Sequence, residues 1–159
     1  MKPFTLDQAL PRGVALLEAS AGTGKTFSIA GLSLRLIAEL DIPVSELLIV
    51  TFTRAATAEL AGRIHTRLIE GARHIRKHLG GDELNTRDPV MRALCKGVEV
   101  DEIQQRLRRL EIAIASFDEA AISTIHSFCQ RSLQSAAFES STEFEAEMEA
   151  EIRPLLEEC

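Results

Sequence analysis

The 159-residue sequence contains no tryptophan, no tyrosine and only three cysteines. Stacking on a base would therefore use one of the seven phenylalanines, a histidine or an arginine. Cys95, Cys129 and Cys159 are odd in number and form no C-x-x-C pair. This pattern argues against a disulfide framework and against a structural zinc site. We interpret the cysteines as reduced thiols of a cytoplasmic protein.

Long apolar runs are absent as well. The sequence has no stretch of about 18 apolar residues, as a membrane-spanning helix requires. The N-terminal residues also lack the apolar segment of a signal peptide. Both absences argue against a membrane-embedded or secreted protein, and we expect no membrane partner.

Positive charge is in deficit, since the formal net charge is -6. The deficit is uneven, because residues 139–159 hold eight of the 24 acidic residues and one of the 18 basic residues. That segment therefore carries -7, and residues 1–138 carry +1. A nearly neutral body is compatible with a nucleic-acid partner despite the acidic total.

Hydrophobic periodicity predicts alternating strands and helices in the first half. The apolar run 14–19 predicts a buried strand that leads into a turn of small residues, followed by a helix over 25–40. A second strand, buried on both faces, is expected over 47–52, and a long helix over 55–79. The inner faces of the two helices are expected to carry Phe27, Ala30, Leu34 and Ile37 or Ala38, and Ala56, Leu60, Ile64 and Leu68. Strand, turn, helix and strand form a right-handed βαβ unit of a parallel sheet.

The second half is expected to add helices and one more strand. Residues 80–89 have the composition of a loop, and 89–116 are typical of a short helix followed by a longer one. A third strand is expected over 120–124 and a helix over 126–137. The longer helix is expected to present Ile103, Leu107, Leu110 and Ile114 on one face.

A phosphate-binding pattern follows the first expected strand. In such a loop, consecutive backbone amides converge on a polyphosphate, and glycines permit the close approach. Lys25 can reach the β- and γ-phosphates, and the Thr26 hydroxyl can ligate Mg²⁺. A glycine-rich turn can also occur by coincidence, but the strand before it and the helix after it favour ATP with Mg²⁺ as the ligand. The pattern comprises Ala19, Ser20, Ala21, Gly22, Thr23, Gly24, Lys25 and Thr26.

A carboxylate to hold the magnesium is not evident. Asp118 and Glu119 follow an apolar run and resemble the acidic pair at the end of a strand. Leu107, Leu110 and Ile114, however, continue a helical period into that run. We therefore interpret the acidic pair as a helix end or a turn.

The end of the second strand carries Thr51, Phe52, Thr53 and Arg54. Ligands of open α/β sheets bind at the carboxyl ends of the strands, so these residues could stack one base and bind a phosphate. The alternative is structural: Phe52 closes the core, Thr53 caps the next helix and Arg54 is solvated.

Three motifs in order resemble those of a known family. Residues 19–26, 51–60 and 124–129 are similar to the first motifs of the UvrD/Rep class of superfamily 1 DNA helicases. Residues 18–26 and 124–131 are especially similar to the RecB family, the beta subunits of exodeoxyribonuclease V. The similarity extends over essentially all of residues 14–140.

The resemblance implies an α/β fold, an incomplete P-loop NTPase (RecA-like) parallel sheet with flanking helices and a helical insertion. Residues 1–80 would form the P-loop βαβ core, and 81–117 the insertion. Residues 118–138 would add the third strand and helix, and 139–159 an acidic tail that begins an inserted helical subdomain.

The resemblance also implies roles for individual residues. Lys25 and Thr26 would hold phosphate and magnesium and act in catalysis, whereas the second and third motifs would contact DNA. The third motif has a structural alternative, in which Thr124 caps the next helix and His126 occupies its first turn. The implied DNA contacts are Thr51, Phe52, Thr53, Arg54, Thr124 and His126.

The implied activity is ATP-driven translocation on single-stranded DNA and unwinding of double-stranded DNA, in double-strand break repair and recombination. RecC- and RecD-type subunits would be the partners. The magnesium-binding Asp-Glu motif, the arginine-bearing second domain and the nuclease domain are not recognisable in the sequence. We therefore expect the N-terminal part of a longer helicase/exonuclease subunit, which binds nucleotide without unwinding on its own.

Two other functions remain as alternatives to the helicase. One is a small P-loop kinase, which would need arginines in a lid and an acceptor site, neither of which is identifiable. The other is a nucleotide-binding module without turnover.

Two further sequence features are weaker signals. Gln8 is a poor match for a glutamine that reads adenine. The basic residues of 63–78 are by default a solvated helix face, with phosphate contact as the alternative.

Overall fold

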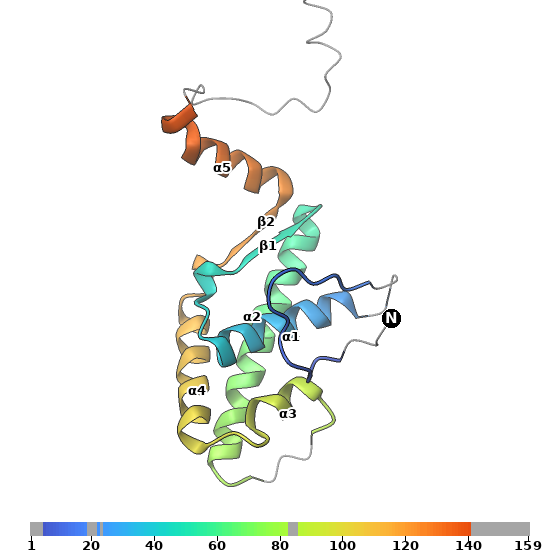
Figure 1. Ribbon diagram of the computed structural model, residues 1–159, viewed down its shortest axis with the longest axis vertical. Helices are drawn as coiled ribbons and strands as arrows, with labels where there is room; N and C mark the ends of the chain where they lie inside the picture. The colour runs from blue at the N-terminus through green and yellow to red at the C-terminus, as the bar shows by residue number, and fades with distance from the viewer. Residues whose placement is uncertain (1–4, 19–21, 23, 83–85, 141–159) are drawn as a thin grey trace, which may run out of the picture.

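The computed structural model describes residues 5–18, 22, 24–82 and 86–140, and it has a mixed α/β architecture (Figure 1). Short 3-10 turns at Val44–Glu46 and Phe117–Glu119 precede the two strands. In chain order the helices and strands are α1 (Lys25–Leu40), β1 (Leu48–Thr51), α2 (Arg54–Leu79), α3 (Pro89–Cys95), α4 (Val100–Ala115), β2 (Ala121–Thr124) and α5 (Ile125–Ser140).

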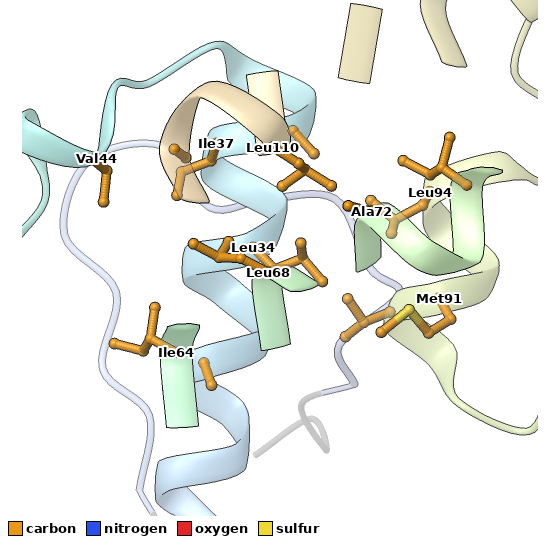
Figure 2. Packing of buried hydrophobic residues seen from close by; sticks show 14 of the residues in the cluster. Leu34, Ile37, Val44, Ile64, Leu68, Ala72, Met91, Leu94 and Leu110 are labelled. Atoms are coloured by element: carbon orange, nitrogen blue, oxygen red, sulfur yellow. The ribbon is translucent and has the colours of Figure 1, made fainter. Parts of the chain in front are cut away.

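The hydrophobic core lies among the first four helices. Helix α1 packs against α2 and α4, and α3 packs against α1 and α2 near the far end of α2. Leu34 of α1, Leu68 of α2 and Leu110 of α4 are completely buried, and Figure 2 shows Leu34 beside Leu68 in the middle of the cluster. Because all four helices contribute to one cluster, 89–115 packs into the same core as α1 and α2.

The two strands form a parallel sheet in which Leu48 pairs with Ala121 and Thr51 with Thr124. Ile49 and Ile122 pack against the helical core. On β1, the opposite face presents Leu48, which is 51% exposed, and Val50, which is 43% exposed. The expectation that this strand is buried on both faces is therefore wrong for the described chain, because α5, which lines a hollow with Leu48, leaves this second face half exposed.

Local signals explain where the helices begin and end. Thr53 caps α2 by accepting a hydrogen bond from the Ala56 amide, and Asp88 caps α3 in front of Pro89. Helix α1 ends at Asp41, which adopts a left-handed conformation with φ of 56°. The predicted helices over 25–40 and 55–79, the pair within 89–116 and the helix over 126–137 are all confirmed, and so are strands at 47–52 and 120–124.

The strand predicted over 14–19 is wrong. Residues 14–18 have no strand structure and are exposed, and residue 19 lies outside the described residues. A strand requires a neighbouring strand for its ladder, and β1 and β2 pair with each other rather than with this segment, whose exposed backbone is open to water. Two inner-face predictions also fail, since Phe27 and Ala56 are exposed.

The prediction for the acidic pair is confirmed, because Asp118 and Glu119 lie in the 3-10 turn that precedes β2 and are both exposed. Residues 141–159 of the predicted acidic tail lie outside the described residues. Within the described part of the chain, no helix is both long enough and apolar enough to cross a membrane.

Candidate functional site

The phosphate-binding pattern lies where α1 begins. Gly22 and Gly24 have φ of 76° and 85°, in the left-handed region that favours glycine. Lys25 is the first residue of α1 and is exposed, and Thr26 is half-buried. The remaining residues of the pattern, Ala19, Ser20, Ala21 and Thr23, lie outside the described residues.

The electrostatics of this helix terminus favour an anion. Gly24 provides no side-chain cap, and the first turn of α1 contains no acidic residue. The first amides of a helix have no carbonyl one turn earlier to bind, and the helix dipole adds partial positive charge at the same place. With Lys25 beside them, these amides form a terminus suited to binding phosphate.

The end of β1 builds a turn that presents Phe52 outward. The Thr51 hydroxyl lies 2.6 Å from the Thr57 hydroxyl, and the Thr53 hydroxyl accepts a hydrogen bond of 3.1 Å from the Ala56 amide. The alternative in which Thr53 caps the next helix is therefore confirmed. Phe52 is 86% exposed, so the alternative in which it closes the core is wrong. Arg54 is exposed beside it.

The end of β2 repeats this arrangement. The Thr124 hydroxyl accepts a hydrogen bond of 3.2 Å from the Ser127 amide at the start of α5. This confirms the alternative in which Thr124 caps the helix, and His126 is exposed in the first turn. Because Thr51 and Thr124 are partners in the parallel register, the two predicted DNA motifs lie at one end of the sheet (Figure 1).

A groove of about 610 Å³ separates the start of α1 from α2. It places Thr26 and Phe27 opposite the N-terminal half of α2, which directly follows the Thr51 to Arg54 turn. The phosphate-binding terminus and the first strand end are therefore linked through α2. The other residues that line the groove are Ala30, Ala58, Glu59, Gly62, Arg63, Thr66, Arg67 and Glu70.

Arg67 lies in this groove, whereas the expectation for the basic residues of 63–78 was a solvated helix face or, as the alternative, phosphate contact. It is only 7% exposed and lies among the buried residues of α2. The available signal was its position three residues after Ile64 and directly before Leu68, within the apolar stripe. Arg63, in contrast, is exposed and pairs with Glu59 across one helical turn.

A second hollow, at the far end of α2, is lined by two groups with shifted pKa values, His74 and Cys95. Burial lowers the pKa of His74 and raises the pKa of the Cys95 thiol. Lys96 and His78 also line the hollow. Across the described residues, no group of three or more histidine, cysteine or acidic side chains is placed to hold a metal ion.

The glycine turn, the open helix start and the two strand ends all lie within a region that matches one family of helicase domains. The family model of the UvrD/REP helicase N-terminal domain matches residues 5–159, and the chain belongs to this family. Its relatives include the RecBCD enzyme subunit RecB of Escherichia coli (strain K12), to which it is 43% identical over 145 residues.

Two further relatives carry the same name. The chain is 36% identical over 160 residues to the RecB subunit of Mycobacterium tuberculosis (strain CDC 1551 / Oshkosh), and 36% identical over 144 residues to that of Haemophilus influenzae. The three comparisons cover 86%, 99% and 85% of this chain. The matched region is only 12% to 14% of the length of these relatives.

Proposed function

We propose that the chain is the ATP-binding N-terminal part of a RecB-like DNA helicase subunit, in which ATP hydrolysis drives translocation on single-stranded DNA. The observation that carries the proposal is the start of α1. Two glycines with positive φ precede an uncapped helix terminus, and Lys25 and Thr26 follow at once. A helix terminus of this kind is suited to binding a polyphosphate.

Different groups of the turn would bind different parts of the nucleotide. The backbone amides from Ala19 to Lys25 would cradle the phosphates, and the Lys25 ammonium would reach the β- and γ-phosphates. The Thr26 hydroxyl would ligate Mg²⁺, which would neutralise developing charge during phosphoryl transfer. The carboxylate and the arginine that such chemistry needs would come from other parts of the complete protein.

The residues at the carboxyl ends of β1 and β2 would bind the DNA. Phe52 would stack on one base of a single strand, and Arg54 would contact its phosphates. Thr51, Thr53, Thr124 and His126 would line the same end of the sheet. Because Thr53 directly caps α2, which borders the groove beside Thr26, α2 is positioned to connect nucleotide and DNA.

The relatives support the biological setting of the proposal. They are named as subunits of the RecBCD enzyme, so RecC- and RecD-type subunits are the proposed partners. Single-stranded and double-stranded DNA are the proposed substrates, in a cytoplasmic pathway of break repair and recombination. Unwinding and exonuclease activity would belong to the complete subunit. Within it, 1–80 and 118–138 would belong to a RecA-like ATPase domain, 81–117 would be a helical insertion packed against them, and 139–159 would begin a further subdomain.

Substituting Lys25→Ala in the complete protein tests the nucleotide site. We expect binding of a fluorescent ADP analogue and ATP hydrolysis to be lost, because the terminus loses the ammonium group that would contact the phosphates. Lys77→Ala is the matched control, since Lys77 is an exposed lysine in the last turn of α2. Normal nucleotide binding by Lys25→Ala would refute the assignment.

A further inference from the structure

Arg67 contacts the helix turn that carries the phosphate-binding residues. Its guanidinium carbon lies 4.9 Å from the centroid of the Phe27 ring. Phe27 is on α1, directly after Lys25 and Thr26, and Arg67 is near the middle of α2. A guanidinium over an aromatic face is attracted by the ring's negative electrostatic potential, more strongly where water is excluded.

The guanidinium is held in place from two other directions. One terminal nitrogen of Arg67 donates to Glu70 on α2 at 3.1 Å, and the other donates to Asp88. The second oxygen of Asp88 accepts a hydrogen bond of 2.9 Å from the Val90 amide, so this carboxylate is fixed by the start of α3. Contacts with α2 and α3 therefore orient the Arg67 guanidinium independently of its contact with Phe27.

The first turn of α1 is only partly buried in the described structure. Gly24 gives it no side-chain cap, and Phe27 is itself 47% exposed. Buried positions on α1 begin at Ala30. The Nε atom of Arg67 is buried and has no partner within the described residues. If hydrogen bonds alone determined the position of the guanidinium, its Nε–H group would also have an acceptor. The Phe27 ring and the two carboxylates together therefore explain the position of the Arg67 side chain better than hydrogen bonds alone.

We propose that Arg67 is a positioning residue for the nucleotide. By holding the Phe27 ring, it fixes the first turn of α1 and thereby the backbone amides, the Lys25 side chain and the Thr26 hydroxyl that face the phosphates. The inference rests on the proposed nucleotide site. Arg67 acts through Phe27 and does not touch the nucleotide, so its loss affects affinity for ATP more than turnover at saturation.

The test uses the complete protein with Arg67→Lys, Phe27→Leu and the double variant. Lysine keeps the charge but loses the planar fork that meets a ring and two carboxylates together. We expect each single variant to raise the Kd of a fluorescent ADP analogue and the KM for ATP by roughly 3- to 10-fold, with kcat nearly unchanged. The double variant should be no weaker than the single variants, because both remove the same contact.

Arg106→Lys is the matched control. Arg106 is a poorly exposed arginine on α4 that pairs with Glu102 and donates to the carbonyl oxygens of Ala93 and Leu94, on α3. Its substitution should lower the melting temperature without changing the Kd. If Arg67→Lys also lowers only the melting temperature, or if the effects of Arg67→Lys and Phe27→Leu on Kd add, the positioning role is wrong.

Two outcomes separate this inference from the proposed function. Loss of nucleotide binding in Lys25→Ala together with an unchanged Kd in Arg67→Lys refutes the positioning role and leaves the nucleotide site standing. Unchanged binding in Lys25→Ala refutes both. If Arg67→Lys does not fold, Phe27→Leu decides the matter, because its half-exposed position tolerates leucine, and an unchanged Kd there overturns the proposal.

Discussion

Phe52 leaves most of its ring in solvent at the point where β1 passes into α2. The hydroxyl groups of Thr51 and Thr53, on either side of Phe52, form hydrogen bonds with Thr57 and with the Ala56 amide. These bonds fix the backbone that presents the ring. Arg54, also exposed, supplies a positive charge two residues further on. A fixed aromatic face next to a cation suits a single-stranded nucleic acid, whose bases stack and whose phosphates are negative.

Phe52→Ala should weaken binding of the complete protein to single-stranded DNA by about 1–3 kcal/mol, because one base loses its stacking surface. The melting temperature should stay close to that of the parent, since the ring is exposed. Phe52→Trp, which keeps an aromatic face, is the matched variant and should retain affinity. Equal DNA affinity for the alanine and tryptophan variants, measured by fluorescence anisotropy, would remove Phe52 from the DNA site.

The residues that could be predicted from sequence are those governed by local geometry. Gly22 and Gly24 take positive φ, and Thr53 caps α2, because a short stretch of chain decides each of these features. The exposure of Phe52 and the burial of Arg67 depend on which helices pack together. The sequence left a core position or a DNA contact open for Phe52, and a solvated face or a phosphate contact open for Arg67. Only the packing of the helices decides between burial and exposure at these two positions.

At the level of elements, the close packing of α1 on α2 depends on Gly71. A Cβ added at this position would lie 2.7 Å from Cδ1 of Leu34 and 3.4 Å from Cδ1 of Leu110. Both leucines are completely buried, so neither has free space to move into. The glycine thus permits α1, α2 and α4 to meet in one core, which in turn supports the start of α1.

Gly71→Ala should destabilise the domain even though alanine favours helices. The overlap costs about 1–3 kcal/mol, whereas the gain in helix propensity is about 1 kcal/mol. Gly62→Ala, on the same helix, meets nothing within 4 Å and should stabilise by about 0.5–1 kcal/mol. Thermal unfolding of the two variants measures the difference, and a higher melting temperature for Gly71→Ala would contradict the packing described.

Helices and strands differ in how well periodicity predicts them. Helices α1 and α2 satisfy their own backbone hydrogen bonds, so an apolar stripe between a start signal and a breaker located them closely. A strand depends on a neighbour. Residues 48–51 and 121–124 have each other, whereas the equally apolar 14–18 segment has no ladder partner in the described chain and is not a strand.

At the level of the whole molecule, the overall charge is a poor guide to the DNA site. The net charge of -6 arises from 139–159, whereas the proposed DNA contacts lie on the body, which carries +1. The family assignment covers residues 5–159, but the chain spans only about one eighth of the length of the RecB relatives. ATP-driven movement on DNA is therefore a property to be measured on the complete protein.

The most direct measurement is the steady-state ATPase rate of the complete protein with and without single-stranded DNA. A motor must hydrolyse ATP faster when it has a strand to move along, because nucleotide and DNA are coupled through the domain. We predict a rate that rises with single-stranded DNA and is abolished by Lys25→Ala in the same assay. A rate indifferent to DNA would contradict the helicase proposal and favour a kinase or a nucleotide-binding module.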